Sequence, residues 1–361
     1  MKKSKNKSAL EEKNGIQAPE TSSERSISKI RSSRKEQPTA VELIRGILMG
    51  NKTALSRAIT LIESKNKLHL QKANEIIEEC LKNRKKTIRI GITGVPGVGK
   101  STFIEVLGKL LTEKGKKVAV LAVDPTSSMS KGSILGDKTR MEVLVKDDNA
   151  FIRPSPSGDS LGGVARKTRE TIILCEAAGF DVVLIETVGV GQSETAVHGM
   201  VDFFLLLKLS GAGDELQGIK RGIMEMADTI VINKADGINK QASRIAEIEF
   251  TRALHLYPPK ENGWIPKVLQ CSALENEGII EIWHTIQEYL TETKTHFIDK
   301  RKQQNKYWLM QTIEDRLKSD FYQHKAIQAQ FTTLLEQVIE SKISPFIAAE
   351  QLLASHRKEL K

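Results

Sequence analysis

The chain has 361 residues, enough for one large domain with extensions and for a substantial core that needs no disulfides. Its formal net charge is +10, but residues 1–37 contribute half of it, with ten Lys/Arg against five Glu. The basic charge therefore belongs largely to one segment, and no recognition-helix, RNP or zinc-finger pattern supports nucleic-acid binding. No apolar run approaches the roughly 20 residues of a membrane span.

The spacing of the cysteines and the composition of the N-terminal segment indicate a protein of a reducing compartment. Cys80, Cys175 and Cys271 are far apart and form no C-x-x-C pair, so we expect packing residues rather than disulfides. The early lysines are not followed by an apolar stretch, and the glutamates that accompany them are atypical of a transit peptide. We therefore expect a cytoplasmic protein.

Residues 1–38 are rich in Ser, Lys, Arg and Glu and poor in large apolar side chains. Such a composition cannot bury enough surface to fold, so we expect a disordered basic tail. In residues 39–86, apolar side chains recur at i, i+3, i+4 and i+7, first over 55–62 and again over 73–80. This spacing predicts an N-terminal helical segment.

Residues 87–292 alternate short apolar runs with helical patterns. The apolar runs are residues 88–93, 118–123, 182–185, 203–209, 229–232 and 268–269. Such runs suit strands that are buried on both faces of a mainly parallel sheet, where ligands bind at the carboxyl ends of the strands. The pattern predicts an α/β domain in which helices flank the sheet.

The first of these runs leads into a phosphate-binding loop. The pattern G-x-x-x-x-G-K-[ST] is filled at every position by Gly94, Val95, Pro96, Gly97, Val98, Gly99, Lys100 and Ser101. Backbone amides of the loop and of the next helix, which includes Thr102, are expected to bind a polyphosphate. Lys100 can reach the β- and γ-phosphates, and Ser101 can ligate Mg²⁺. The strand–loop–helix context favours a P-loop NTPase over an ordinary glycine-rich turn.

Two further runs end in carboxylates that suit the metal side of this site. Asp124 follows the run 118–123, where a helix N-cap is the alternative role, and Glu186 follows the run 182–185. Mg²⁺ is usually held by few protein oxygens together with phosphates and waters. We expect both carboxylates near Ser101.

The segment after Glu186 predicts how hydrolysis is controlled. It reads E-T-V-G where most GTPases have D-x-x-G, so the amide of Gly189 is expected at the γ-phosphate. Val190 stands where Ras-like enzymes have the glutamine that orients water, and Gln192 follows two residues later. The pattern predicts slow intrinsic hydrolysis that a partner controls.

The base-reading element is expected at the ends of two later strands. The residues are Asn233, Lys234 and Asp236 of an N-K-x-D pattern, and Ser272 and Ala273 of Cys-Ser-Ala. The carboxylate of Asp236 can accept hydrogen bonds from N1–H and the exocyclic amine of guanine, which adenine cannot supply. Asn233 can brace the loop and the Lys234 stem can cover the base. The nucleotide is therefore predicted to be GTP or GDP.

Residues 293–361 are predicted to be helical again. Apolar residues recur every fourth position over 309–321 and form a second stripe over 331–339. Pro345 interrupts the pattern, and a short helix is expected over 346–356. Such an arm either folds back on its own domain or packs on a second copy, and we favour a dimerisation arm.

Four strings give the chain a family resemblance: D-P-T-S-S at 124–128, I-L-G-D-K-T-R-M at 134–141, E-T-V-G-V-G-Q-S-E at 186–194 and G-A-G-D-E-L-Q-G-I-K at 211–220. With these strings the chain resembles the methylmalonyl-CoA mutase-associated GTPases, which are MeaB/ArgK-type metallochaperones. The resemblance extends over about residues 40–345.

The resemblance implies a homodimeric GTPase chaperone of an adenosylcobalamin-dependent acyl-CoA mutase, by default methylmalonyl-CoA mutase. Such a chaperone gates cofactor loading and protects or reactivates the mutase, so adenosylcobalamin is expected only through the partner. By resemblance, Asp124, Asp137 and Glu186 correspond to metal and switch carboxylates. Residues 210–220 correspond to a loop that communicates with the mutase, with Lys220 as its nucleotide-responsive residue.

Three other functions stay open. A P-loop kinase or ATPase linked to amino-acid transport is an older label for this family, although nothing in the sequence forms an amino-acid site. Another metal-cofactor delivery GTPase would usually carry His-rich or Cys-rich tracts, which are absent. Nucleic-acid binding through the basic tail would depend on salt and on residues 1–37.

Overall fold

The computed structural model describes residues 38–64, 66–123, 141–154, 161–187, 193–211 and 221–359. The chain divides into two compact units, Met1–Thr39 and Ala40–Lys361, and the elements described below all belong to the second. Among the described helices, none combines the length and the apolar character needed to cross a membrane.

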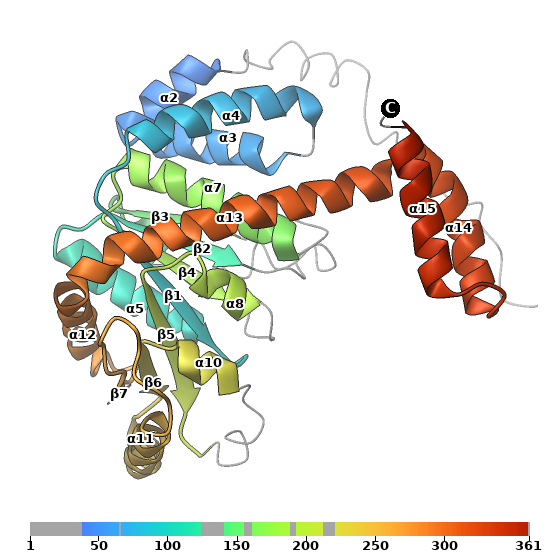
Figure 1. Cartoon of the computed structure of the whole chain (residues 1–361). Coiled ribbons are helices and arrows are strands. Elements are labelled where there is room, and N and C mark those ends of the chain that lie inside the picture. The colour runs from blue at the N-terminus through green and yellow to red at the C-terminus, as the bar shows by residue number, and fades with distance from the viewer. Residues whose placement is uncertain are drawn as a thin grey trace, which may run out of the picture. The chain divides into compact units, whose positions relative to one another are not determined.

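The second unit contains a seven-stranded sheet whose paired strands are all parallel. The order across the sheet is β3-β2-β4-β1-β5-β6-β7 (Figure 1). The strands are β1 (Ile88–Gly94), β2 (Val118–Val123), β3 (Ala150–Arg153), β4 (Val182–Thr187), β5 (Phe203–Leu209), β6 (Thr229–Asn233) and β7 (Lys267–Gln270). β1 is central, with Ile90 opposite Leu184 of β4 and Phe203 of β5. The predicted α/β fold with a mainly parallel sheet is confirmed.

Helices cover both faces of this sheet. The described helices are α2 (Ala40–Leu48), α3 (Lys52–Glu63), α4 (Lys67–Lys82), α5 (Lys100–Glu113), α7 (Leu161–Ala178), α8 (Ser193–His198), α10 (Arg221–Met226), α11 (Lys240–Leu254), α12 (Ile279–Glu292), α13 (Lys294–Gln323), α14 (Lys325–Ile339) and α15 (Pro345–Glu359), of which α14 and α15 lie away from the sheet at the end of α13 (Figure 1). On one side, α2, α3 and α4 pack beside α7, whereas α5 contacts α12 on the other (Figure 1). The apolar stripes of 55–62 and 73–80 thus lie in α3 and α4.

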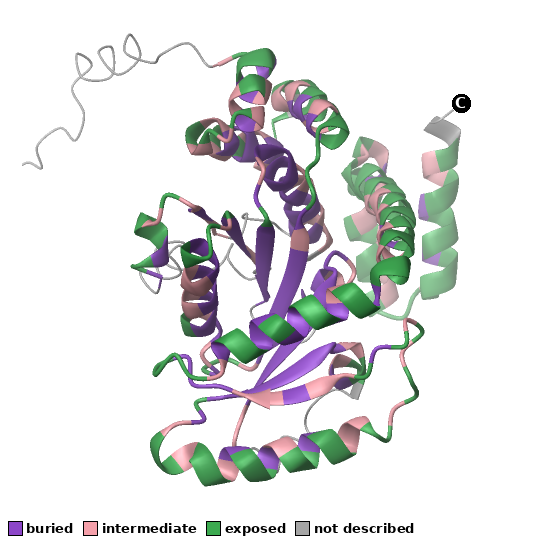
Figure 2. Cartoon of the chain, turned by 90° about the vertical axis from the view of Figure 1, so that its left-hand side faces the viewer, coloured by how far each residue is buried: buried purple, intermediate pink, exposed green. Residues whose placement is uncertain are grey.

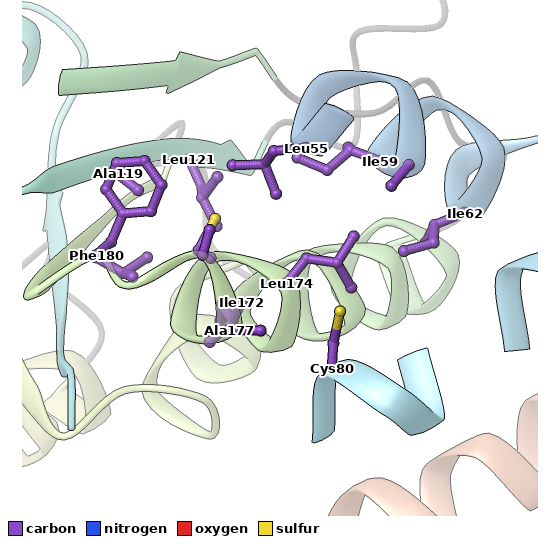
Figure 3. Close-up of a cluster of buried hydrophobic side chains, with 14 of the residues drawn as sticks. Leu55, Ile59, Ile62, Cys80, Ala119, Leu121, Ile172, Leu174, Ala177 and Phe180 are labelled. Carbon is purple, nitrogen blue, oxygen red and sulfur yellow. The ribbon is translucent and has the colours of Figure 1, made fainter. Parts of the chain in front are cut away.

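Alternate residues of a strand join different apolar cores, of which there are three among the described residues. In β2, Ala119 and Leu121 join the cluster that includes α3 and α7, whereas Val118 and Val120 join the cluster that includes α5 and α12. Figure 3 shows Leu55 of α3 in the first of these clusters. The strands are buried along most of their length, and the green outer faces of the helices are exposed (Figure 2). The sheet is therefore a rigid base for the loops at its carboxyl edge.

The C-terminal helices are much more exposed than the rest. In α13, which has 30 residues, the buried side chain is Gln304, and the apolar Leu309 and Leu317 are 62% and 64% exposed. α15 is longer than the expected 346–356, because Pro345 is its first residue rather than an interruption beyond it. Proline fits the first helical position, where its missing N–H would have no helical acceptor.

Candidate nucleotide-binding site

The loop between β1 and α5 has a backbone that only glycine fits at two positions. Gly99 precedes α5 with φ 95°, and a Cβ atom there would lie 2.7 Å from Asn233 Nδ2. Gly94 has φ 152°, and a Cβ atom there would lie 2.6 Å from the Leu207 carbonyl oxygen. The positive end of α5 follows directly, which suits a bound anion. Val95, Pro96, Gly97 and Val98 complete the loop, and Thr102 is exposed in the first turn of α5.

Lys100 lies inside this loop and is only 8% exposed. Its Nζ donates to the carbonyl oxygens of Gly94, at 2.8 Å, and Val95, at 3.1 Å. Burial lowers the pKa of Lys100, and the nearby carboxylates of Glu186 and Glu194 oppose that shift. A polyphosphate in the loop would offer this ammonium anionic oxygens in place of neutral carbonyls, which makes Lys100 suited to binding phosphate charge.

Ser101 and Glu186 meet on the other side of the loop. Ser101 Oγ donates to Glu186 Oε1 over 3.1 Å, and the glutamate is 9% exposed at the carboxyl end of β4. The next residue, Thr187, donates from Oγ1 to Thr93 Oγ1 over 2.8 Å and so joins the ends of β4 and β1. A hydroxyl and a carboxylate are oxygen donors of the kind that Mg²⁺ prefers, so the two side chains fit a magnesium site beside the phosphates.

Asn233 and Lys234 connect the end of β6 to the phosphate loop. Asn233 is 1% exposed and donates from Nδ2 to the Val98 carbonyl oxygen over 2.8 Å. Lys234 has φ 60° and donates from Nζ to the Gly97 carbonyl oxygen over 2.9 Å. The same Asn233 accepts from the Ala273 amide at Oδ1 over 3.2 Å. These bonds fix the position of the loop after β6 relative to the phosphate loop.

Asp236 is oriented by Ser272 from the strand end next to it. Ser272 Oγ donates to Asp236 Oδ2 over 2.5 Å, and the Ala235 amide donates to the Cys271 carbonyl oxygen over 3.0 Å. Ser272 itself is fully buried. The carboxylate is therefore held in one orientation, with its other oxygen available to a base that carries adjacent N–H donors.

Four of the predicted site residues lie outside the described part of the chain: Asp124, Asp137, Gly189 and Gln192. The same holds for Lys220. The described residues bring together the phosphate loop, Glu186, the N-K-x-D residues, Ser272 and Ala273. Across the described part of the chain, no group of three or more His, Cys, Asp or Glu side chains could hold a metal ion by itself.

Glu194 is a residue of this region to which the sequence assigned no role. It lies in the first turn of α8, is 2% exposed, and its charge acts on Lys100. The one feature of the sequence that could have pointed to Glu194 is its position two residues after Gln192. The sequence could not show that this carboxylate is buried, because acidic residues in a first helical turn are usually exposed.

Three comparisons bear on the identity of this site. The family model described as methylmalonyl Co-A mutase-associated GTPase MeaB matches residues 55–326. GTPase ArgK of Escherichia coli is 45% identical over 318 residues, covering 88% of this chain and 96% of ArgK. The mitochondrial methylmalonic aciduria type A homolog of Mus musculus is 45% identical over 335 residues, covering 90% of this chain and 81% of that protein.

A solved structure agrees with these sequence matches. The crystal structure described as LAO/AO transport system kinase has a TM-score of 0.71 and 38% identity, and the match covers 90% of this chain and 100% of that one. The P-loop fold and the relatives named as GTPases show that the protein is a GTPase. The chain belongs to the methylmalonyl Co-A mutase-associated GTPase MeaB family.

Proposed function

We propose that this GTPase is a chaperone of an adenosylcobalamin-dependent acyl-CoA mutase, with methylmalonyl-CoA mutase as the expected client. It gates loading of the cofactor and protects or reactivates the mutase, and adenosylcobalamin reaches it only through that partner. The match of the MeaB family model over residues 55–326 carries this proposal. The mouse relative supports it, since its name refers to methylmalonic aciduria.

In the proposed reaction, GTP and water give GDP and phosphate. Lys100 and the amides of residues 94–101 bind the β- and γ-phosphates, where negative charge shifts during transfer. Asp236, held by Ser272, selects guanine through its N1–H and amine. Asn233 and Lys234 tie the base to the phosphate loop, so that one rigid site contacts both ends of the nucleotide.

The proposed metal ligands are Ser101, Glu186, Asp124 and Asp137. The hydrogen bond between Ser101 and Glu186 supports the first pair, because both oxygens already face one point beside the phosphate loop. When bound, Mg²⁺ supplies positive charge to the β- and γ-phosphate oxygens. Asp124 and Asp137 are proposed as ligands because of their positions in the strings that resemble the family.

Hydrolysis by the isolated protein is proposed to be slow. Gly189 is assigned to the γ-phosphate and Gln192 to the attacking water, although Val190 stands at the position that carries glutamine in Ras-like enzymes. A partner that orders this segment would then set the turnover rate. A slow enzyme with a cytoplasmic mutase partner acts as a switch rather than a metabolic catalyst.

The arm over residues 293–361 is proposed to form a homodimer beside the nucleotide-binding domain of residues 87–292. Its helices enclose an apolar groove of about 620 Å³. The groove is lined chiefly by Leu317, Phe321, Tyr322, Phe331, Leu334 and Leu352. A second copy is the expected occupant, since exposed leucines on α13 continue beside this groove.

A kinase linked to amino-acid transport is the second candidate, and one observation favours it. The structure with a TM-score of 0.71 is described as LAO/AO transport system kinase. That activity would require transfer of phosphate from ATP to a protein or amino acid. Incorporation of labelled phosphate from ATP into a third molecule would support this candidate over hydrolysis of GTP.

The direct test of the client is capture from cell extract on immobilised full-length protein. The beads are loaded either with a non-hydrolysable GTP analogue or with GDP, and bound proteins are identified by mass spectrometry. Retention of an adenosylcobalamin-dependent mutase that differs between the two states supports the proposal. Equal or absent retention of any such mutase contradicts it.

A further inference from the structure

The loop between α8 and β5 is held by two side chains of α13. Gln304 donates from Nε2 to the Val201 carbonyl oxygen over 2.8 Å, and Trp308 donates from Nε1 to the Gly199 carbonyl oxygen over 2.8 Å. Residues four apart lie on one face of a helix, so both donors approach the same loop. Gln304 is the buried side chain of an otherwise exposed helix, which marks this contact as the place where α13 is fixed.

Asp202 fastens the end of the same loop to α13 and to β1. Arg301 donates from Nε to Oδ1 over 2.9 Å and from Nη2 to Oδ2 over 2.7 Å, a bidentate pair. The Arg89 amide of β1 donates to Oδ2 over 2.8 Å, and Lys300 donates to the Asp202 carbonyl oxygen over 2.7 Å. Asp202 is 1% exposed, and the bonds that it receives from Arg301 and Lys300 are partly buried. The loop, α13 and the start of β1 are therefore one connected body.

α8 extends this connection to the phosphate site. A Cβ atom at Gly91 of β1 would lie 3.0 Å from Val197 Cγ1 and 3.1 Å from Val201 Cγ2, so α8 and its following loop press on β1 without space between them. Gly91 lies three residues before Gly94, the first residue of the phosphate loop. The strand under α8 is the one that leads into the phosphate loop.

We propose that Gln304 and Trp308 are positioning residues for GTP hydrolysis. Through the loop 199–202 they hold α8 against β1, and thereby fix the position of the phosphate loop and of Lys100, which follow directly on β1. Charges that are fixed before the reaction stabilise a transition state better than charges that must first reorganise. A helix of the C-terminal arm thus sets the rate at a site on the sheet edge. The inference depends on the GTPase activity and not on the mutase client.

The first test measures steady-state GTP hydrolysis by full-length Gln304→Met and Trp308→Phe variants. Each substitution removes the N–H donor and keeps an apolar side chain of related shape. We expect kcat to fall about fivefold in each, the effect of about 1 kcal/mol at the transition state, with the KM for GTP and the affinity for GDP unchanged. The matched control is Gln303→Met, an exposed glutamine one position earlier on α13, which should behave as wild type.

A purely structural role would give a different result. It would lower the melting temperature of both variants and leave kcat equal to that of Gln303→Met, and this outcome overturns the proposal. A second measurement uses only the wild-type protein, so that the proposal can be tested even if a variant fails to fold. Exchange of GDP for a non-hydrolysable GTP analogue should alter amide hydrogen exchange in 193–202 and 300–308 together. A change in 193–202 with none in 300–308 also overturns it.

Discussion

At the scale of single residues, the site depends on side chains that hold one another. Ser272 fixes Asp236, Asn233 fixes the phosphate loop, and Glu186 receives the Ser101 hydroxyl. The residue types of these pairs could be predicted from the sequence, because phosphate and guanine recognition require them at known spacings. The approach of Glu186 to Ser101 was also expected, but the hydrogen bonds from Ser272 to Asp236 and from Asn233 to Val98 were not, since each joins segments more than 30 residues apart.

Asp236→Asn replaces an acceptor by a donor opposite the guanine amine. We expect GTP binding to weaken by about 2 kcal/mol, roughly thirtyfold. Xanthosine triphosphate should bind better to the variant than to the wild type, because its carbonyl accepts from the new amide. Competition against a fluorescent GDP analogue measures both affinities. Asp320→Asn, at an exposed position of α13, is the control, and an unchanged preference in Asp236→Asn would remove that residue from base recognition.

Lys100→Ala removes the ammonium that lies inside the phosphate loop. We expect kcat for GTP to fall at least about a hundredfold, because no other described side chain donates to the loop carbonyls of Gly94 and Val95 from that position. Lys114→Ala, at the exposed end of α5, should keep wild-type activity. Single-turnover assays with purified protein distinguish the two. Normal turnover by Lys100→Ala would contradict its assigned role.

At the scale of elements, the apolar runs in the sequence predicted most of the strands. They could not predict the polar contacts that attach one element to another. Every predicted run lies within an observed strand. β3, with four residues at one edge of the sheet, was not predicted, although the equally short β7 at the other edge was. The helices of the arm were predicted from apolar spacing, but α13 is attached through Gln304 and Trp308, whose role depends on carbonyls of a distant loop.

The end of α8 should make folding stability depend on pH. Burial, together with the nearby Lys300, lowers the pKa of His198 from 6.5 to about 4, with Asp228 opposing and Lys260 adding to the shift. The unfolded chain binds this proton near pH 6.5 and the folded protein does not, so stability is lost as pH falls from 6.5 towards 4. We expect the loss to reach up to about 3 kcal/mol.

Urea unfolding at about pH 7 and about pH 5 measures this dependence. The variant His198→Asn, which cannot titrate, should lose less stability between the two conditions than the wild type. The stability of the variant at about pH 5 is compared with its own stability at about pH 7, so that the effect of the substitution itself cancels. Equal losses in both proteins would show that the pKa of His198 is not lowered in the folded protein, which contradicts the prediction.

At the scale of the whole molecule, the GTPase carries a C-terminal helical arm, and a mutase is its proposed client. The P-loop and N-K-x-D strings identified the nucleotide, and the family strings identified the proposed partner. Much of those strings, including 124–128 and 212–220, lies outside the described residues. The proposed connection from α13 through α8 and β1 to the phosphate loop would let binding at the arm and hydrolysis of GTP influence each other.

The groove of α13, α14 and α15 provides a test of the proposed dimer. Leu317 is 64% exposed and lines the groove, so Leu317→Asp places a charge in an apolar contact between copies. We expect the variant to be monomeric in light scattering at concentrations where the wild type is dimeric. Ser319→Asp adds the same charge at an exposed position of the same helix and should stay dimeric. A wild type that is itself monomeric would contradict the dimer.

The most direct measurement of the central claim is nucleotide-dependent binding of the purified mutase, with Asp236→Asn as a specificity switch. Binding to the full-length proteins is followed by calorimetry with non-hydrolysable analogues of GTP and of xanthosine triphosphate. We predict that the wild type changes its affinity for the mutase with the GTP analogue, and that Asp236→Asn does so with the xanthosine analogue instead. Mutase binding that is the same with both analogues and with GDP, in both proteins, would contradict a guanine-nucleotide-controlled chaperone.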